Sequence, residues 1–204
     1  MIVPTMTLEE IRKELEKDFP ILFRKVCYVT KDWNKRLSKA EKEKGFERFY
    51  EYCSKYKNQW IYRIHITKND SDCTATMLYY NGKGHAAITM TRTTEFIYHT
   101  GHFFERYNER RNLGLKTIND VIRAYMRENN RYDFKSVETV APNIEKIFCS
   151  INSGILLGMI NKNVKVVKAN TFIPNEMLSK NQSELKLQII NELEKYKDTS
   201  GILN

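Results

Sequence analysis

The pattern of apolar positions predicts helices over the first part of the chain. A capping box of Thr7 and Glu10 opens the first helix, and its apolar residues recur at helical spacing. These residues are Leu8, Ile11 and Leu15. We expect this helix to end at Pro20, and apolar and aromatic residues within 21–56 predict two or three more. The mixed-sign charge of 39–45 favours a solvated helix end there, and a nucleic-acid-binding helix is the alternative.

An alternating pattern then replaces the helical one. Apolar and other side chains alternate over residues 60–67, which is typical of a strand with one apolar face. Strands at 74–80 and 85–93 are predicted on either side of Asn81-Gly-Lys-Gly84, a hairpin signal because glycine accepts a positive φ. A short strand at 95–98 completes an antiparallel meander.

Two helices and a second group of strands are predicted next. One helix extends from Thr100 to about Gly114, and the other follows a capping box of Thr117 and Asp120. Three further strands and a long terminal helix follow, at 144–151, 155–160, 164–172 and 175–196.

These elements together predict an α+β fold class. We expect an antiparallel meander sheet with an N-terminal helical segment, a central helix pair and a long C-terminal helix. Neither an internal repeat nor a Pro/Gly-rich linker divides the chain. We therefore predict a single domain over residues 1–204, in which the helical segment 1–57 packs on or extends an α+β core at 58–198.

The composition indicates a folded, basic protein. Hydrophobic residues make up 41% and aromatic residues 12% of the 204 positions, which is enough for a core and argues against a disordered chain. The formal net charge of +9 favours a polyanionic partner such as nucleic acid. Because the lysines are scattered, a general basic bias of the source proteome is the alternative explanation.

Cysteine spacing and hydropathy indicate the cellular compartment of the protein. Cys27, Cys53, Cys73 and Cys149 show no C-x-x-C pairing, which indicates reduced thiols rather than a disulfide framework or a zinc ribbon. The first residues lack the features of a signal peptide, and no apolar run approaches the ~18–20 residues that span a bilayer. We expect a cytoplasmic protein without a membrane partner.

Cationic and titratable side chains are concentrated on one predicted helix. His102, Arg106 and Arg110 are spaced at i, i+4 and i+8, so they share one side of it. Glu105 and Glu109 form a neighbouring row and are potential partners of the arginines. The first backbone N–H groups of a helix and its dipole attract anions. This helix face therefore predicts contact with phosphate.

Such a face suits cleavage of RNA without a metal or another cofactor. The reaction needs a base for the 2′-hydroxyl, a cation for the phosphorane and an acid for the leaving oxygen. His102, close to the helix N-terminus, is biased toward the neutral form and is the candidate base. His99, just before the helix, is a further candidate. The alternatives are a salt-bridged surface without function and a metal site at His99, His102 and Glu105.

A family resemblance rests on the same residues. The segment H-F-F-E-R-Y-N-E-R at 102–110 lies after a β-like segment and before a Thr-capped helix with D-V-I-R-A. It resembles the H-x3-R-x-x-E-R helix of small bacterial and phage toxin-like proteins, which are grouped with the barnase, EndoU, colicin and RelE-type (BECR) ribonuclease fold. The resemblance covers about 97–128. The matching positions are His102, Arg106, Glu109 and Arg110.

The resemblance also implies an arrangement around the helix. Such folds often place a Thr or Ser on a late strand that faces the helix, and Thr171 is the residue so implied here. In those proteins the helix usually opens a compact domain, whereas four strand-like segments and several helices precede it in this chain.

Three functions stay open from the sequence. The first is a metal-independent, toxin-like ribonuclease, and the second is a non-catalytic module that binds nucleic acid. In the second, Tyr62, Tyr79 and Tyr80 are candidate stacking platforms. The third is a structural or partner-binding protein of phage or mobile-element type, assembled through its terminal helix. We expect nucleic acid, RNA rather than DNA, as the partner, with a protein partner as the alternative.

Overall fold

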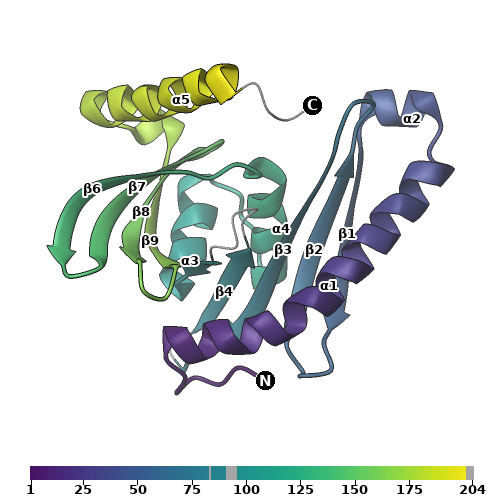
Figure 1. The fold of residues 1–204 in the computed structure, drawn as a ribbon, viewed down its shortest axis with the longest axis horizontal. Coiled ribbons are helices and arrows are strands. Elements are labelled where there is room, and N and C mark those ends of the chain that lie inside the picture. Colours follow the sequence, from purple (N-terminus) through teal and green to yellow (C-terminus); the bar gives the residue numbers. More distant parts are fainter. Residues whose placement is uncertain (83, 91–95, 201–204) are drawn as a thin grey trace. The chain divides into compact units, whose positions relative to one another are not determined.

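Helices and antiparallel strands make up the computed structural model, which confirms the predicted α+β class (Figure 1). The structure describes residues 1–82, 84–90 and 96–200, without the side chains of 193–200. The chain divides into two units. The first consists of Met1–Gly101 with Val164–Val166, and the second of His102–Asn163 with Val167–Asn204. The single domain over 1–204 stays a prediction.

Five antiparallel strands form the sheet of the first unit, adjacent in the order of the sequence. They are β1 (Phe46–Cys53), β2 (Gln59–Ile66), β3 (Ser71–Tyr80), β4 (His85–Met90) and β5 (Phe96–His99). The predicted strands at 60–67 and 74–80 are confirmed by β2 and β3. Those at 85–93 and 95–98 are confirmed for their described parts, since 91–95 lie outside the described residues.

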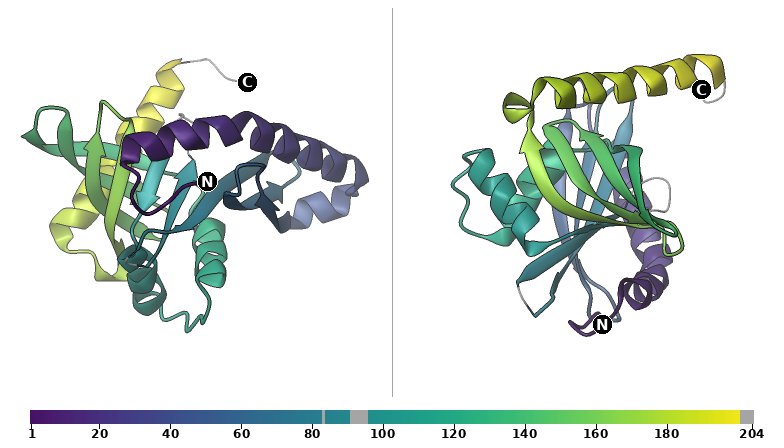
Figure 2. Two further views of the ribbon diagram at one scale, coloured as in Figure 1. Left: turned by 90° about the horizontal axis from the view of Figure 1, so that it is seen from below. Right: turned by 90° about the vertical axis from the view of Figure 1, so that its left-hand side faces the viewer.

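Helix α1 (Leu8–Arg36) lies across one face of this sheet (Figure 2). Its capping box is confirmed, because the backbone N–H of Thr7 donates to Glu10 at 2.8 Å and the N–H of Glu10 donates to Thr7 Oγ1 at 3.3 Å. The predicted end at Pro20 is wrong. Beyond this exposed proline, Leu22 and Val26 continue the buried stripe, so packing on the sheet outweighs the lost backbone hydrogen bond.

Residues 46–53 form strand β1, and the helix predicted there is wrong. They pair with β2 along their whole length, and the rings of Tyr50 and Tyr62 stack at 5.0 Å between centroids. Such cross-strand pairs stabilise a strand but leave no local signature in the sequence. Only the short helix α2 (Lys39–Lys44) lies between α1 and β1, so the predicted helical segment 1–57 is helical no further than Lys44.

A buried carboxylate connects the core of the first unit to its amino terminus. Asp18 of α1 is 1% exposed and accepts from Asn58 Nδ2 at 2.7 Å and from Trp60 Nε1 at 3.1 Å. The side-chain oxygen of Asn58 accepts from the backbone N–H of Ile2 at 3.0 Å. Helix, sheet and N-terminal segment are thus joined by one polar network inside an apolar core.

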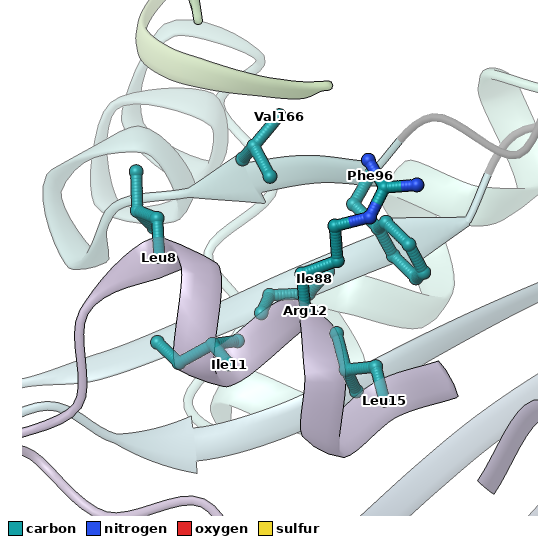
Figure 3. Close-up of a pocket in the computed structure, with 7 residues that line it drawn as sticks. All are labelled: Leu8, Ile11, Arg12, Leu15, Ile88, Phe96 and Val166. Carbon is teal, nitrogen blue, oxygen red and sulfur yellow. The ribbon is translucent and has the colours of Figure 1, made fainter. Parts of the chain in front are cut away.

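The amino-terminal end of α1 packs closely on the sheet (Figure 3). The Arg12 guanidinium lies 5.6 Å from the centre of the Phe96 ring and donates to the carbonyl of Val164. The lining residues are Leu8, Ile11, Arg12, Leu15, Ile88, Phe96 and Val166. Because the space between them admits no water molecule, we interpret this place as packed core and not as a ligand site.

The second unit combines two helices, a four-stranded meander and a terminal helix. After α3 (Gly101–Arg110) come α4 (Ile118–Glu128), β6 (Asp133–Ala141), β7 (Ile144–Ile151), β8 (Gly154–Asn161), β9 (Val166–Pro174), the 3-10 helix η1 (Asn175–Met177) and α5 (Lys180–Ser200). Strands β6 to β9 are adjacent in the order of the sequence. The central helix pair, the strands β7 to β9 and the terminal helix are present as predicted. However, α3 ends at Arg110 and not near Gly114, and α5 begins at Lys180 and not at residue 175.

Local signals account for α4 but not for β6. The predicted cap of α4 is present, since the N–H of Asp120 donates to Thr117 Oγ1 at 3.2 Å. Strand β6 was not predicted, because Ser136–Val140 are all exposed and show no apolar alternation. Its pairing with β7, interrupted by two register shifts, is what defines it.

The apolar side of α5 packs on the strands of its own unit. Ile189 is buried with Phe148 and Ile155, and Lys186 Nζ donates to the carbonyls of Ile151 at 2.8 Å and Gly154 at 2.9 Å. These contacts account for the apolar side of α5 without a partner protein. Assembly through this helix stays a prediction.

No helix in the described part of the chain has both the length and the apolar character that crossing a membrane requires. The four cysteines carry free thiols, as expected.

The Asp18 network gives a first testable prediction. Asp18→Ala leaves two buried donors, Asn58 Nδ2 and Trp60 Nε1, without their acceptor, so we expect the free energy of unfolding to fall by about 2–4 kcal/mol. Urea denaturation followed by tryptophan fluorescence measures it. The control is Glu16→Ala, because this half-exposed carboxylate pairs with Arg12 at 2.8 Å, and it should change the value by less than about 1 kcal/mol. Equal losses would contradict the role given to Asp18.

Candidate functional site

Aromatic packing fixes the rotation of α3 in the second unit. Phe103, Phe104 and Tyr107 are at most 1% exposed. The ring of Phe103 meets Tyr125 of α4 at 5.3 Å, and Tyr107 meets Phe172 of β9 at 5.0 Å, both edge to face. Because this side of the helix is held against α4 and β9, the opposite side faces solvent. It carries the exposed side chains of His102, Glu105, Arg106 and Glu109.

His102 and Glu105 form a pair on the exposed side of α3. Their side chains are 85% and 72% exposed, and His102 Nδ1 lies 2.8 Å from Glu105 Oε2. A carboxylate accepts hydrogen bonds, so Nδ1 carries the proton in this pair. The neutral ring then presents Nε2 as its basic nitrogen. Glu105 thus selects the tautomer that a proton acceptor at Nε2 requires.

Arg106 and Arg110 both reach strand β9, in different ways. Arg106 Nη1 donates to the hydroxyl of Thr171 at 3.4 Å on the exposed surface. Arg110 is partly buried and its Nη1 donates to the backbone carbonyl of Phe172. Arg106 is therefore the guanidinium that remains at the surface, and Arg110 fastens the helix to the strand.

Two glycines of β8 allow β9 to lie where Thr171 meets the helix. A Cβ atom at Gly154 would come within 2.1 Å of the Ile173 carbonyl oxygen, and one at Gly158 within 2.1 Å of the Lys168 carbonyl oxygen. No side chain fits at either distance, so the absence of Cβ is what permits this approach of the two strands.

The remaining predicted residues lie outside this group. Glu109 is exposed, and within the described residues its side chain makes no hydrogen bond or ion pair, although its backbone carbonyl accepts from the N–H of Asn112 at 2.9 Å. His99 lies on β5 of the first unit and is 0% exposed. Burial lowers the pKa of His99 to about 3, although hydrogen bonds to the backbone at Ala87 and Ile97 act in the other direction. A neutral, enclosed imidazole does not exchange protons with a bound substrate, so we leave His99 out of the candidate site.

The metal alternative finds no support. Among the described residues, no group of three or more His, Cys, Asp or Glu side chains is placed to hold a metal ion. The stacking role considered for Tyr62 is also excluded, since this ring is 1% exposed, whereas Tyr80 is 57% exposed.

The structure contains a polar network at the end of α3 that the sequence does not predict. Tyr107 donates from its hydroxyl to Glu128 at 2.6 Å, and Arg111 pairs with Glu128 at 3.2 Å and with Glu176 at 2.7 Å. Burial and the hydrogen bond to Glu128 raise the pKa of Tyr107. The partners come from α4 and η1, so no spacing along α3 reveals them. The network stabilises the helix that carries the candidate site.

We compared the chain with known proteins, and no family model, no curated protein and no solved structure matches it.

The burial of His99 predicts a pH dependence of stability. Its pKa is lower in the folded chain, at about 3, than its ordinary value of 6.5, so the unfolded chain binds the extra proton between these values. The free energy of unfolding should therefore fall as the pH drops from about 6.5 toward 3, by up to ~1.4 kcal/mol per pH unit from this group. Urea denaturation at several pH values measures the slope.

His99→Gln should flatten that slope, because it removes the titrating group. His102→Gln is the matched control and should keep the slope of the unchanged chain, since this imidazole is exposed. A slope that His99→Gln leaves intact would contradict the burial of a neutral imidazole.

Proposed function

We propose that the exposed side of α3 binds the phosphodiester backbone of RNA and cleaves it without a metal. One observation carries the proposal. Arg106 meets Thr171 at 3.4 Å, one helical turn from the His102–Glu105 pair. An imidazole with a fixed tautomer, a guanidinium and a hydroxyl thus lie on one accessible surface of the second unit.

Each side chain has a role that follows from its contacts. His102 accepts the proton of the 2′-hydroxyl at Nε2, and Glu105 orients the ring and stabilises the imidazolium that forms. The Arg106 guanidinium neutralises the phosphorane oxygens, with Thr171 holding it in place. We assign no side chain to the leaving 5′-oxygen, whose proton solvent can supply.

The order of elements supports the resemblance noted in the sequence. The second unit opens with α3, continues with α4 and ends with a four-stranded antiparallel meander and α5. A compact domain opened by this helix, with a late-strand threonine facing it, is what the resemblance to the BECR ribonuclease fold implies. A cytoplasmic location, where RNA is the abundant polyanion, belongs to the same proposal.

A second candidate is binding of RNA without cleavage. It is favoured by Arg110, whose guanidinium is engaged by the Phe172 carbonyl. One surface guanidinium and one imidazole are sufficient for phosphate contact, whereas cleavage also needs stabilisation of a dianionic phosphorane. The net charge of +9 supports either candidate.

The catalytic proposal predicts cleavage of total RNA in the presence of EDTA. His102→Ala should reduce the rate by about 100-fold or more, because it removes the base. Gel electrophoresis of timed samples gives the rates. The control is Lys146→Gln, which removes a cation that pairs with Glu138 at 2.6 Å in the same unit, and it should cleave as the unchanged chain does. Equal cleavage by the His102→Ala and unchanged chains, or none by either, removes the catalytic proposal.

The binding proposal predicts that the affinity for RNA falls with salt concentration and that Arg106 contributes to this dependence. A 2′-O-methylated single strand lacks the nucleophile and reports binding alone. Arg106→Gln should lower the slope of log K against log salt by about 0.7, the value for one phosphate contact in a single strand. Fluorescence anisotropy measures the slope. Lys146→Gln removes the same charge and should leave it unchanged, so equal decreases in the two variants would show a general charge effect and overturn the proposed contact.

A further inference from the structure

The second half of α1 carries a row of exposed side chains that the packing of the first unit does not use. Arg24, Tyr28, Lys31 and Lys35 are spaced at i, i+4, i+7 and i+11, so they lie along one side of the helix. All four are exposed, and Tyr28 is 74% exposed. We call these four residues the α1 stripe.

The α1 stripe faces away from the sheet. Leu22 and Val26, which lie on the opposite side of the same turns, are 1% and 3% exposed and belong to the core of the first unit. Figure 2 shows α1 lying across the strands, which leaves its outer side uncovered in this unit. A tyrosine that is three-quarters exposed between cations adds little to folding, because its ring buries little apolar area.

Charge is segregated along the helix. Between Phe19 and Lys31 the sequence contains no Asp or Glu, whereas Glu9, Glu14 and Glu16 pair with cations in the first turns of α1. Arg36 pairs with Asp32 at 3.0 Å. Within the described residues, no carboxylate pairs with a cation of the α1 stripe. Arg24 donates from Nε to the backbone carbonyl of Pro20 at 3.2 Å.

We propose that the α1 stripe is a contact surface for single-stranded RNA, with a base stacked on Tyr28 and phosphates paired with Arg24, Lys31 and Lys35. An aromatic ring flanked by cations is the combination that binds single strands without reading their sequence. The row is about 16 Å long, from the helical rise of 1.5 Å per residue, and so spans several nucleotides. The choice of RNA rests on the proposed function, but the residues involved are different.

An anionic membrane fits the α1 stripe less well. A helix that binds a bilayer surface inserts an apolar side, and the apolar side of α1 is already buried on the sheet. The α1 stripe itself offers three cations and a tyrosine, which match a phosphate backbone and exposed bases.

The test measures binding of the full chain to a labelled, 2′-O-methylated single strand by fluorescence anisotropy at several salt concentrations. Lys31→Gln/Lys35→Gln should lower the salt slope by about 1.4, twice the value for one phosphate contact. The control is Lys13→Gln/Lys17→Gln on the first half of α1, where Lys13 pairs with Glu9 and Lys17 with Glu14. This pair should leave the slope unchanged.

Variants of Tyr28 separate the contribution of base stacking to the affinity from that of charge. Tyr28→Ala should weaken binding roughly tenfold, and Tyr28→Phe should bind as the unchanged chain does, because the ring persists. Equal slopes for the two double variants, unchanged affinity of Tyr28→Ala, or tighter binding to phosphatidylserine vesicles than to the RNA strand would each overturn the inference. Circular dichroism shows whether each variant folds, and an unfolded Tyr28→Ala is replaced by Tyr28→Ser.

The outcome is distinguishable from failure of the proposed function. Loss of affinity in the α1 variants with no effect of Arg106→Gln supports the α1 stripe and contradicts the site on α3. The reverse result supports α3 alone. A chain that binds no RNA at low salt contradicts both.

Discussion

The edge-to-face contact between Tyr107 and Phe172 is the interaction on which the candidate site depends. Together with Phe103 and Tyr125, these rings set how α3 is turned against α4 and β9. A shift of one residue would rotate the helix by about 100° about its own axis, and a different set of side chains would then face solvent. The exposure of His102 and the contact of Arg106 with Thr171 are therefore consequences of an apolar contact made on the other side of the helix.

Residues of one chemical type serve different ends in this chain according to their surroundings. His99 is buried, with its pKa lowered to about 3, whereas His102 is exposed and paired with Glu105. Arg110 binds a backbone carbonyl, but Arg106 stays at the surface. Residue type alone gives a list of candidates, and burial with hydrogen-bond partners decides which of them reach a substrate.

The sequence predicts what local forces determine. The cap at Thr117 and the alternation in β2 are visible in it, and both elements are present. The continuation of α1 beyond Pro20 could not be predicted, because burial of Leu22 in the core of the first unit decides it. Strands β1 and β6 owe their conformation to pairing with β2 and β7. Within the candidate site, the sequence shows that His102 and Arg106 lie one helical turn apart on α3. The contact with Thr171, 65 positions along the chain, followed only from a family resemblance.

The central claim is that an exposed, Glu105-oriented imidazole on α3 meets the RNA backbone. Nuclear magnetic resonance of the histidine ring protons during titration with a 2′-O-methylated strand tests it most directly, with His102→Gln to assign the signal. The account predicts that the His102 Cε1–H resonance shifts in a saturable way at low salt, while that of the buried His99 stays in place. Saturable binding of the strand with an unchanged His102 resonance would contradict it.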